Sequence, residues 1–208
     1  MADQLRRDRV IAKGTGAPPD DLADPMYLKE LHLQCEFALG AYGELRIRVA
    51  AGSTDLVMLA FAHMLLVFAG NAAKLVFPSP RATTVTTNRA IRLRAKLGIP
   101  DGAPVGLVDA RNYFEHFDER MDRLLESHDG LLIHRLIVPV VSEQVELDDG
   151  RRFKARYLQL LQTASLELTL YDQTIKLPEL AQEVELLGKN AAEALTRLGD
   201  RKDAKKGR

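Results

Sequence analysis

Apolar residues recur every three or four positions through the first half of the chain, which is the spacing of one face of an α-helix. From Pro25 to Gly52 this pattern predicts a first helix. Its apolar face consists of Leu28, Leu31, Cys35, Leu39, Tyr42, Leu45 and Val49. A second helix, capped by Ser53 or Thr54, is predicted to end before Pro78. Its body is apolar nearly all round, so we expect it at the centre of a helical bundle.

Two further helices are predicted before the middle of the chain ends. The segment TTNRAIRLRAKLG favours a short basic helix closed by Gly98. After a loop rich in proline and glycine, the stretch from Val108 to Ser127 predicts a fourth helix. Its apolar stripe consists of Leu107, Ala110, Phe114, Phe117, Met121, Leu124 and Leu125. Four helices of this kind indicate a bundle.

After Gly130 the pattern changes to the alternation of apolar and polar residues that is typical of strands. The predicted strands lie in LLIHRLIVPVV, EQVELDDGRRFKARYLQLL and SLELTLYDQTIKL. The DDG triplet signals a hairpin. One covered sheet face is predicted from the alternation of two sets, Phe153, Ala155 and Tyr157 against Arg152, Lys154 and Arg156. Pro178 then opens a final amphipathic helix.

These patterns together predict an α+β fold that is mainly α. We expect an antiparallel helical bundle with a small antiparallel β-sheet inserted before the C-terminal helix. The predicted organisation is a flexible lead at 1–24, the bundle at 25–130, a β-meander at 131–177, the C-terminal helix at 178–199 and a disordered basic tail at 200–208.

Charge and cysteine content narrow the classes of function. Lys plus Arg and Asp plus Glu both number 29, so no global charge attracts nucleic acid, and any RNA contact must be local. A row of basic residues in the predicted sheet is better explained as a solvated face than as an RNA contact; it consists of Arg151, Arg152, Lys154 and Arg156. The single cysteine, Cys35, excludes an intramolecular disulfide and a cysteine-based zinc cluster. It is either a small core residue or a reactive thiol.

Location and cofactors are predicted from what the sequence does not contain. No secretory signal is recognisable at the N-terminus, and polar residues interrupt the apolar stretch from Leu56 to Phe77. We therefore expect a cytoplasmic protein with no membrane contact. The histidines have no metal-ligand spacing, and no phosphate-binding glycine loop occurs, so we expect neither a metal nor a cofactor.

Polar and charged residues gather at the predicted start of the fourth helix, in the stretch RNYFEH. At about 100° per residue, Asn112 and His116 share a face opposite the apolar stripe, and Arg111 lies at the border of that stripe. Arg111 is expected in the first turn, where free N–H groups and the helix dipole favour a phosphate. An arginine that neutralises a phosphate and a histidine that transfers a proton are the minimum for cleaving RNA through its own 2′-hydroxyl without a metal.

The RNYFEH stretch resembles the R-x-x-x-x-H motif of the HEPN superfamily, in which a polar residue often follows the arginine. The resemblance covers about residues 25–128 and can extend to the last helix, and it implies a helical-bundle endoribonuclease. We expect such an enzyme to act as a toxin or stress effector that is restrained by an antitoxin or another protein partner. The resemblance implies that Arg111 binds the phosphate, that His116 is the general acid or base, and that Asn112 is an orienting residue. It also implies a homodimer in which two motifs form one composite site. Many members are non-catalytic, so a binding or scaffold protein that dimerises through the same helix face is the alternative.

Each of these candidates has a structural alternative. Arg111 and His116 could belong to a solvated face with weak ion pairs. Arg123 and His128 have the same spacing, but they lie at the end of the predicted helix, where no free N–H groups favour an anion. His63, Asn71 and Lys74 could line a substrate cleft beside the fourth helix. The favoured interpretation is a hydrogen-bonded core histidine with polar neighbours and a lysine that reaches solvent.

Overall fold

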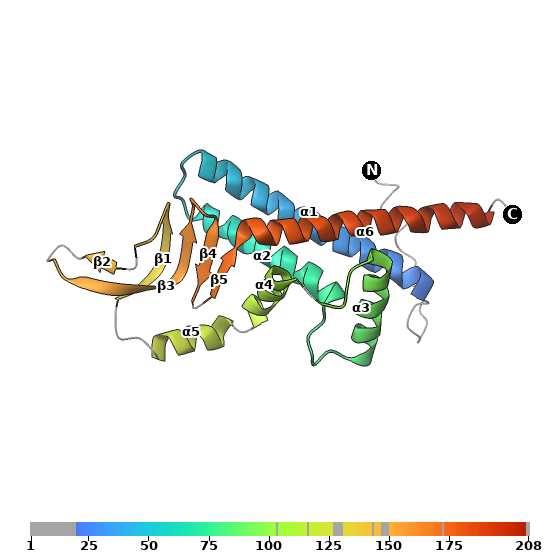
Figure 1. Cartoon of the computed structure of the whole chain (residues 1–208), viewed down its shortest axis with the longest axis horizontal. Helices are drawn as coiled ribbons and strands as arrows, with labels where there is room; N and C mark the ends of the chain where they lie inside the picture. The colour runs from blue at the N-terminus through green and yellow to red at the C-terminus, as the bar shows by residue number, and fades with distance from the viewer. Residues whose placement is uncertain are drawn as a thin grey trace, which may run out of the picture.

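The computed structural model describes residues 20–102, 104–115, 117–126, 131–142, 144–146, 150–171 and 173–206. It confirms a mainly helical α+β fold with a small sheet placed before the C-terminal helix (Figure 1). The helices are α1 Asp20–Ala50, α2 Val57–Val76, α3 Thr84–Leu97, α4 Val105–Glu115, α5 Phe117–Glu126 and α6 Leu177–Lys206. The strands are β1 Leu131–Val138, β2 Gln144–Glu146, β3 Arg152–Gln162, β4 Glu167–Leu170 and β5 Gln173–Lys176.

Helix α2 is the central helix, as its apolar sequence predicts. It packs against α1, α3, α4 and α6. By length and composition alone α2 is apolar enough to cross a membrane, but half of its most apolar window is buried inside the protein, as in a core helix. The predicted cap is wrong: the N-cap is Leu56, without a side-chain hydrogen bond, and the Ser53 hydroxyl instead accepts from the Asp55 N–H.

The apolar stripe predicted for α1 faces the core. Leu28, Leu31, Cys35 and Leu45 have no exposed surface. Helix α6 crosses α1 closely at this stripe, because a Cβ added to Gly188 would lie 2.9 Å from the Cβ of Cys35. Burial raises the pKa of the Cys35 thiol to about 12, so the thiol stays protonated at neutral pH. Of the two interpretations of Cys35, the core residue is the one that fits.

The first helix begins earlier than predicted. Residues 20–24 were assigned to a flexible lead, but α1 begins at Asp20 and includes Pro25. Asp24 is only 2% exposed, and its carboxylate pairs with Arg92 at 3.2 Å and Lys96 at 3.4 Å on α3. These ion pairs join the start of α1 to α3, and the sequence pattern near Pro25 contains no sign of them. Residues 1–19 lie outside the described residues.

The predicted antiparallel sheet is instead mixed. Its strand order is β1-β3-β4-β5, with β2 also paired to β3. The expected hairpin is present, since β2 and β3 are antiparallel, and β3–β4 and β4–β5 are antiparallel too. However, β1 is parallel to β3, with Ile133 opposite Tyr157. The chain reverses at both ends of β2, so β3 runs in the same direction as β1. Figure 1 shows this sheet at one end of the molecule.

Helix α6 confirms the predicted start at Pro178 but not the predicted end. Pro178 is its second residue, as its fixed φ and missing N–H favour. The helix continues to Lys206, so residues 200–206 are helical, contrary to the disordered tail predicted from charge. Most residues in RKDAKK are strong helix formers, which allows the helix to extend beyond the last core contacts. Residues 207 and 208 lie outside the described residues.

Candidate functional site

The helix that carries the RNYFEH motif begins earlier than the sequence predicted. Helix α4 starts at Val105, directly after Pro104, so Arg111 is in its second turn and not in its first. Two N–H groups of the true first turn are already bound to an acidic side chain. Gly106 and Leu107 donate to the carboxylate of Glu183 on α6, at 3.4 and 2.9 Å. The anion that binds to this helix end is therefore the carboxylate of Glu183, which belongs to the same chain.

Glu183 acts as a cap supplied by another helix. A Cβ at Gly106 would lie 2.7 Å from a Glu183 carboxylate oxygen, so only glycine leaves room for this contact. Burial raises the pKa of Glu183, and the hydrogen bonds from Leu107 and Gly106 partly oppose that rise. Sequence reasoning missed Glu183 because it lies more than 70 residues along the chain from the N–H groups that it caps. No local signal could have identified it.

The structure brings Arg111 and Asn112 together. The guanidinium donates from Nη1 to the Phe77 carbonyl at 2.8 Å. It donates from Nε and Nη2 to the Asn112 side-chain oxygen at 3.0 and 2.8 Å. Both side chains are half-buried. The contacts fix the direction of the guanidinium, and Asn112 holds it as an orienting residue would. His116 lies outside the described residues, as does His128.

Arg111 belongs to a group of three arginines that bind the C-terminal end of α2. Arg89 and Arg94 on α3 donate to the carbonyls of Lys74 and Val76 at 3.2 and 2.8 Å, beside the Arg111 bond to Phe77. The last carbonyls of a helix have no partner within it, and cations stabilise its negative end. We name Arg89, Arg94 and Arg111 the arginine cap. Basic residues following a helix end were the available signal for Arg89 and Arg94.

Gly70 sets the position of Arg111. A Cβ at Gly70 would meet the Ala110 carbonyl oxygen at 3.0 Å and the Arg111 Cα at 3.2 Å. The α4 backbone therefore lies directly on α2 at this point. Tyr113, which the predicted apolar stripe omitted, turns inward and is 3% exposed, stacked against Tyr171 with ring centroids 6.4 Å apart. The Arg111 side of α4 is thus anchored by backbone contact as well as by hydrogen bonds.

The three residues predicted to line a substrate cleft do not lie together. His63 lines a small pocket of about 180 Å³ with Arg135 and Gln159 of the sheet, and its ring lies 6.3 Å from that of Tyr113. It is therefore beside α4, as expected. Asn71 instead donates to Gln34 of α1 at 3.3 Å, and Lys74 is exposed near the arginine cap. Neither of them lines the His63 pocket.

The environment of His63 predicts a pH dependence of stability. Burial, and secondarily the charge of Arg135, lower the pKa of His63. The unfolded chain then binds a proton more readily than the folded one, so stability is complete above the unfolded pKa and falls as pH decreases towards the folded pKa. The loss is at most about 1.4 kcal/mol for each pH unit between those two values.

Urea unfolding between about pH 7.5 and pH 5.5 measures this dependence. His63→Gln should flatten the slope, whereas the same change at the exposed His134 should leave it as in the wild type. An identical slope in the wild type and in His63→Gln would contradict the assigned role of His63.

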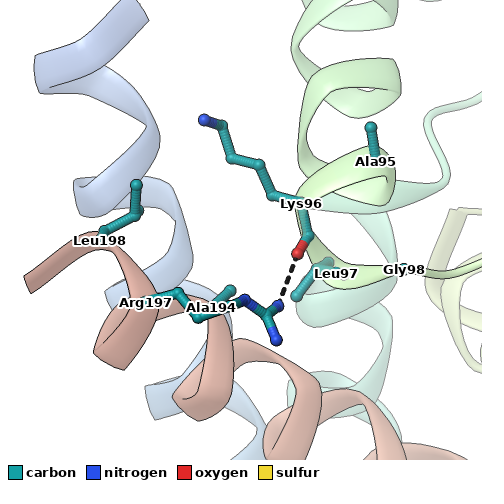
Figure 2. A pocket seen from close by; sticks show the side chains of 7 residues that line it. All are labelled: Ala95, Lys96, Leu97, Gly98, Ala194, Arg197 and Leu198. Carbon is teal, nitrogen blue, oxygen red and sulfur yellow. Dashed lines mark hydrogen bonds between the residues drawn. The ribbon is translucent and has the colours of Figure 1, made fainter. Parts of the chain in front are cut away.

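A larger pocket lies away from the motif. It measures about 510 Å³ between the end of α3 and α6, and its lining residues are Ala95, Lys96, Leu97, Gly98, Ala194, Arg197 and Leu198. Figure 2 shows the Arg197 guanidinium reaching across to the Lys96 carbonyl, at 2.9 Å. This arginine satisfies a carbonyl at the end of α3 as the arginine cap does for α2. None of the described residues of RNYFEH lines this pocket.

Comparisons with known proteins add no family to this geometry. No family model matches the chain, and no curated protein and no solved structure matches it significantly.

Proposed function

We propose that this protein is a HEPN-like, metal-independent endoribonuclease that cleaves RNA with Arg111 and His116. In this proposal it acts in the cytoplasm, as a toxin or stress effector restrained by an antitoxin or another protein partner, and it forms a homodimer. The proposal rests on the RNYFEH motif and on the way in which Arg111 is held.

The observation that best supports the proposal is the fixed, half-buried guanidinium of Arg111. A guanidinium has five N–H donors. The Phe77 and Asn112 oxygens take three of them, from Nη1, Nε and Nη2. Among the described residues the second N–H on each of Nη1 and Nη2 has no such bond, and two N–H donors are the number that a phosphate accepts from arginine. An arginine oriented in advance loses little conformational freedom when it binds an anion.

The proposed chemistry uses no metal. The imidazole of His116 takes the proton of a ribose 2′-hydroxyl, and the 2′-oxygen attacks the adjacent phosphorus. The bond from phosphorus to the 5′-oxygen breaks, and that oxygen leaves with the proton that the His116 imidazole has taken up. Arg111 stabilises the charge that develops on the non-bridging oxygens. Asn112 keeps the guanidinium in position through the bonds described above.

Cleavage of RNA by the purified chain in EDTA tests the proposal. We expect wild-type protein to cleave, His116→Ala to lower the rate by about 10²–10⁴-fold, and Arg111→Ala to lower it by about 10²-fold or more. Two matched variants should retain the wild-type rate. Arg94→Ala also removes an arginine bonded to the end of α2, and His128→Ala removes the histidine of the similarly spaced pair outside the motif.

The matched variants separate catalysis from folding. If Arg94→Ala and Arg111→Ala lowered the rate equally and destabilised the fold equally, the role of Arg111 would be only structural. Cleavage by His116→Ala at the wild-type rate would remove the catalytic proposal altogether.

The second candidate is a non-catalytic HEPN-like binding or scaffold protein. It is favoured by the bond that the Arg111 guanidinium donates to the Phe77 carbonyl, which gives the arginine a structural role at the end of α2. This candidate predicts that wild-type protein leaves RNA intact in the same assay, while Arg111→Ala and Arg94→Ala both lower stability.

A further inference from the structure

Two polar side chains interrupt the apolar face that the sheet turns towards α2. Arg135 of β1 lies directly opposite Gln159 of β3 in the parallel ladder. Residues two positions apart in a strand share a face, and the neighbours of this pair on that face are apolar. They are Ile133 and Ile137 in β1, and Tyr157 and Leu161 in β3. The sheet therefore presents two adjacent hydrogen-bond donors in the middle of an apolar region.

The two side chains belong to the His63 pocket, which lies between the sheet and the start of α2 (Figure 1). Its volume of about 180 Å³ corresponds to about six water molecules at about 30 Å³ each. This is enough space for one phosphate group. The lining residues are Leu56, Leu59, Ala60, His63, Arg135 and Gln159. No acidic side chain occurs among these six residues, so the wall of the pocket holds no negative charge of its own.

The donors of the sheet are not used elsewhere in the described part of the chain. There the guanidinium of Arg135 and the side-chain amide of Gln159 form no hydrogen bond and no ion pair. By contrast, Arg48, Arg92 and Arg94 are each paired with an aspartate, at 3.1, 3.2 and 3.1 Å. A guanidinium can only donate, and a glutamine amide can turn its NH₂ group to the same side. A ligand that satisfies both groups must supply acceptor oxygens.

His63 adds a donor from the α2 side of the same pocket. Burial, and secondarily the charge of Arg135, lower the pKa of its imidazole. The guanidinium and a protonated imidazole would therefore repel each other across the pocket. An anion between them attracts both groups and removes that repulsion. The neutral imidazole also keeps one N–H that can be donated to an anion.

The start of α2 favours negative charge at the same place. Leu56 is the N-cap of α2 and lines the pocket with Leu59 and Ala60 of the first turn. The cap has no side-chain hydrogen bond, and the first turn contains no acidic residue. Asp55, which precedes the cap, is paired with Arg48 at 3.1 Å. The positive end of the α2 dipole therefore adds to the potential that the side chains of the pocket create.

We propose that the His63 pocket is a binding site for one phosphate group, held by Arg135, Gln159 and His63. The guanidinium and the amide donate to phosphate oxygens from the sheet, and the imidazole donates to another oxygen from α2. Arg135 is exposed, so the pocket is open to solvent, and the group can belong to free phosphate or to an RNA backbone. The site does not rest on the proposed nuclease, since none of the described residues of RNYFEH lines it.

Calorimetric titration of the purified full chain with inorganic phosphate, at pH 7 and constant ionic strength, tests the site. We expect saturable binding of one phosphate per chain. Arg135→Gln should weaken the affinity by about tenfold or more, because it removes charge-assisted hydrogen bonds. Arg156→Gln is the matched control, since it removes the same charge from an exposed position on the other face of β3. Its affinity should stay within about twofold of the wild type, because salt screens exposed charges.

A short single-stranded RNA distinguishes the two sources of the phosphate group. It carries 2′-O-methyl groups and no terminal phosphate, so it cannot be cleaved through its 2′-oxygens, and binding is measured apart from any nuclease activity. Displacement of inorganic phosphate by this RNA would assign the pocket to an RNA backbone, and retention of phosphate would assign it to free phosphate. Absence of saturable phosphate binding by the wild type would overturn the proposal, and so would equal weakening by Arg135→Gln and Arg156→Gln.

Discussion

Gly70→Leu is expected to lower the free energy of unfolding by about 3 kcal/mol, because a side chain at this position must displace backbone. The nearest atoms to a Cβ at Gly70 are the Ala110 carbonyl oxygen and the Arg111 Cα, at 3.0 and 3.2 Å. Backbone within a packed helix cannot rotate away as a long side chain can. Helix α4 would have to move off α2, which would also strain the bond from Arg111 to Phe77. Urea-induced unfolding of the purified variant measures the loss.

Gly199 provides the matched control for Gly70. It also lies within a helix, but a Cβ there would meet nothing within 4 Å. Gly199→Leu should leave stability unchanged or raise it by less than about 1 kcal/mol through better helix propensity. If Gly70→Leu were as stable as the wild type, the close contact of α2 and α4 would be wrong, and so would the position assigned to Arg111.

Glu183→Ala is expected to lower the free energy of unfolding by about 2 kcal/mol, because it leaves two N–H donors at the start of α4 without an acceptor. Leu107 is 1% exposed, so water cannot readily replace the carboxylate at its N–H. Glu183→Gln keeps an acceptor oxygen and removes a charge that burial disfavours, as the raised pKa of Glu183 indicates. We therefore expect Glu183→Gln to be far less destabilising than Glu183→Ala.

Glu185 is the control for this prediction, since it lies two residues further along α6 and is exposed. Glu185→Ala should change the free energy of unfolding by no more than about 0.5 kcal/mol. Equal unfolding midpoints for Glu183→Ala and Glu185→Ala would show that the cap contributes nothing.

The helices that could be predicted from sequence are those whose burial follows a single stripe. In α1 the spacing of Leu28, Leu31 and Cys35 was sufficient, and in α3 the end at Gly98 was confirmed by its φ of 66°. The start of α4 was not predictable in this way. The residues at its start, Pro104, Val105 and Gly106, are typical of a loop, and its cap comes from Glu183 on another helix. Local patterns carry no information about a partner that distant.

The predicted direction of β1 in the sheet was wrong for a related reason. The alternation of Phe153 and Tyr157 with exposed arginines correctly predicted a strand with one covered face. Alternation sets which residues share a face but not the direction of the neighbouring strand. Whether β1 runs parallel or antiparallel to β3 depends on the course of the chain between them, where the short β2 pairs with β3.

The candidate site was predictable only in part. The sequence predicted that Arg111 and Asn112 belong to the same site, and their side chains do bond to each other. It could not identify Phe77, 34 residues earlier, as the acceptor that holds the guanidinium. Helical spacing relates residues within one element, so it placed His63, Asn71 and Lys74 near one face of a helix. It did not reveal that His63 faces the sheet, that Asn71 bonds to α1 and that Lys74 is exposed.

The arginine cap makes the end of α2 a junction on which both α3 and α4 depend. If α3 detached, the carbonyls of Lys74 and Val76 would lose their donors, and the helix end to which Arg111 is bonded would weaken. Opening of α4 would in turn remove one of three cations from the same negative pole. We therefore expect the two helices to open and close as one cooperative unit at the end of α2.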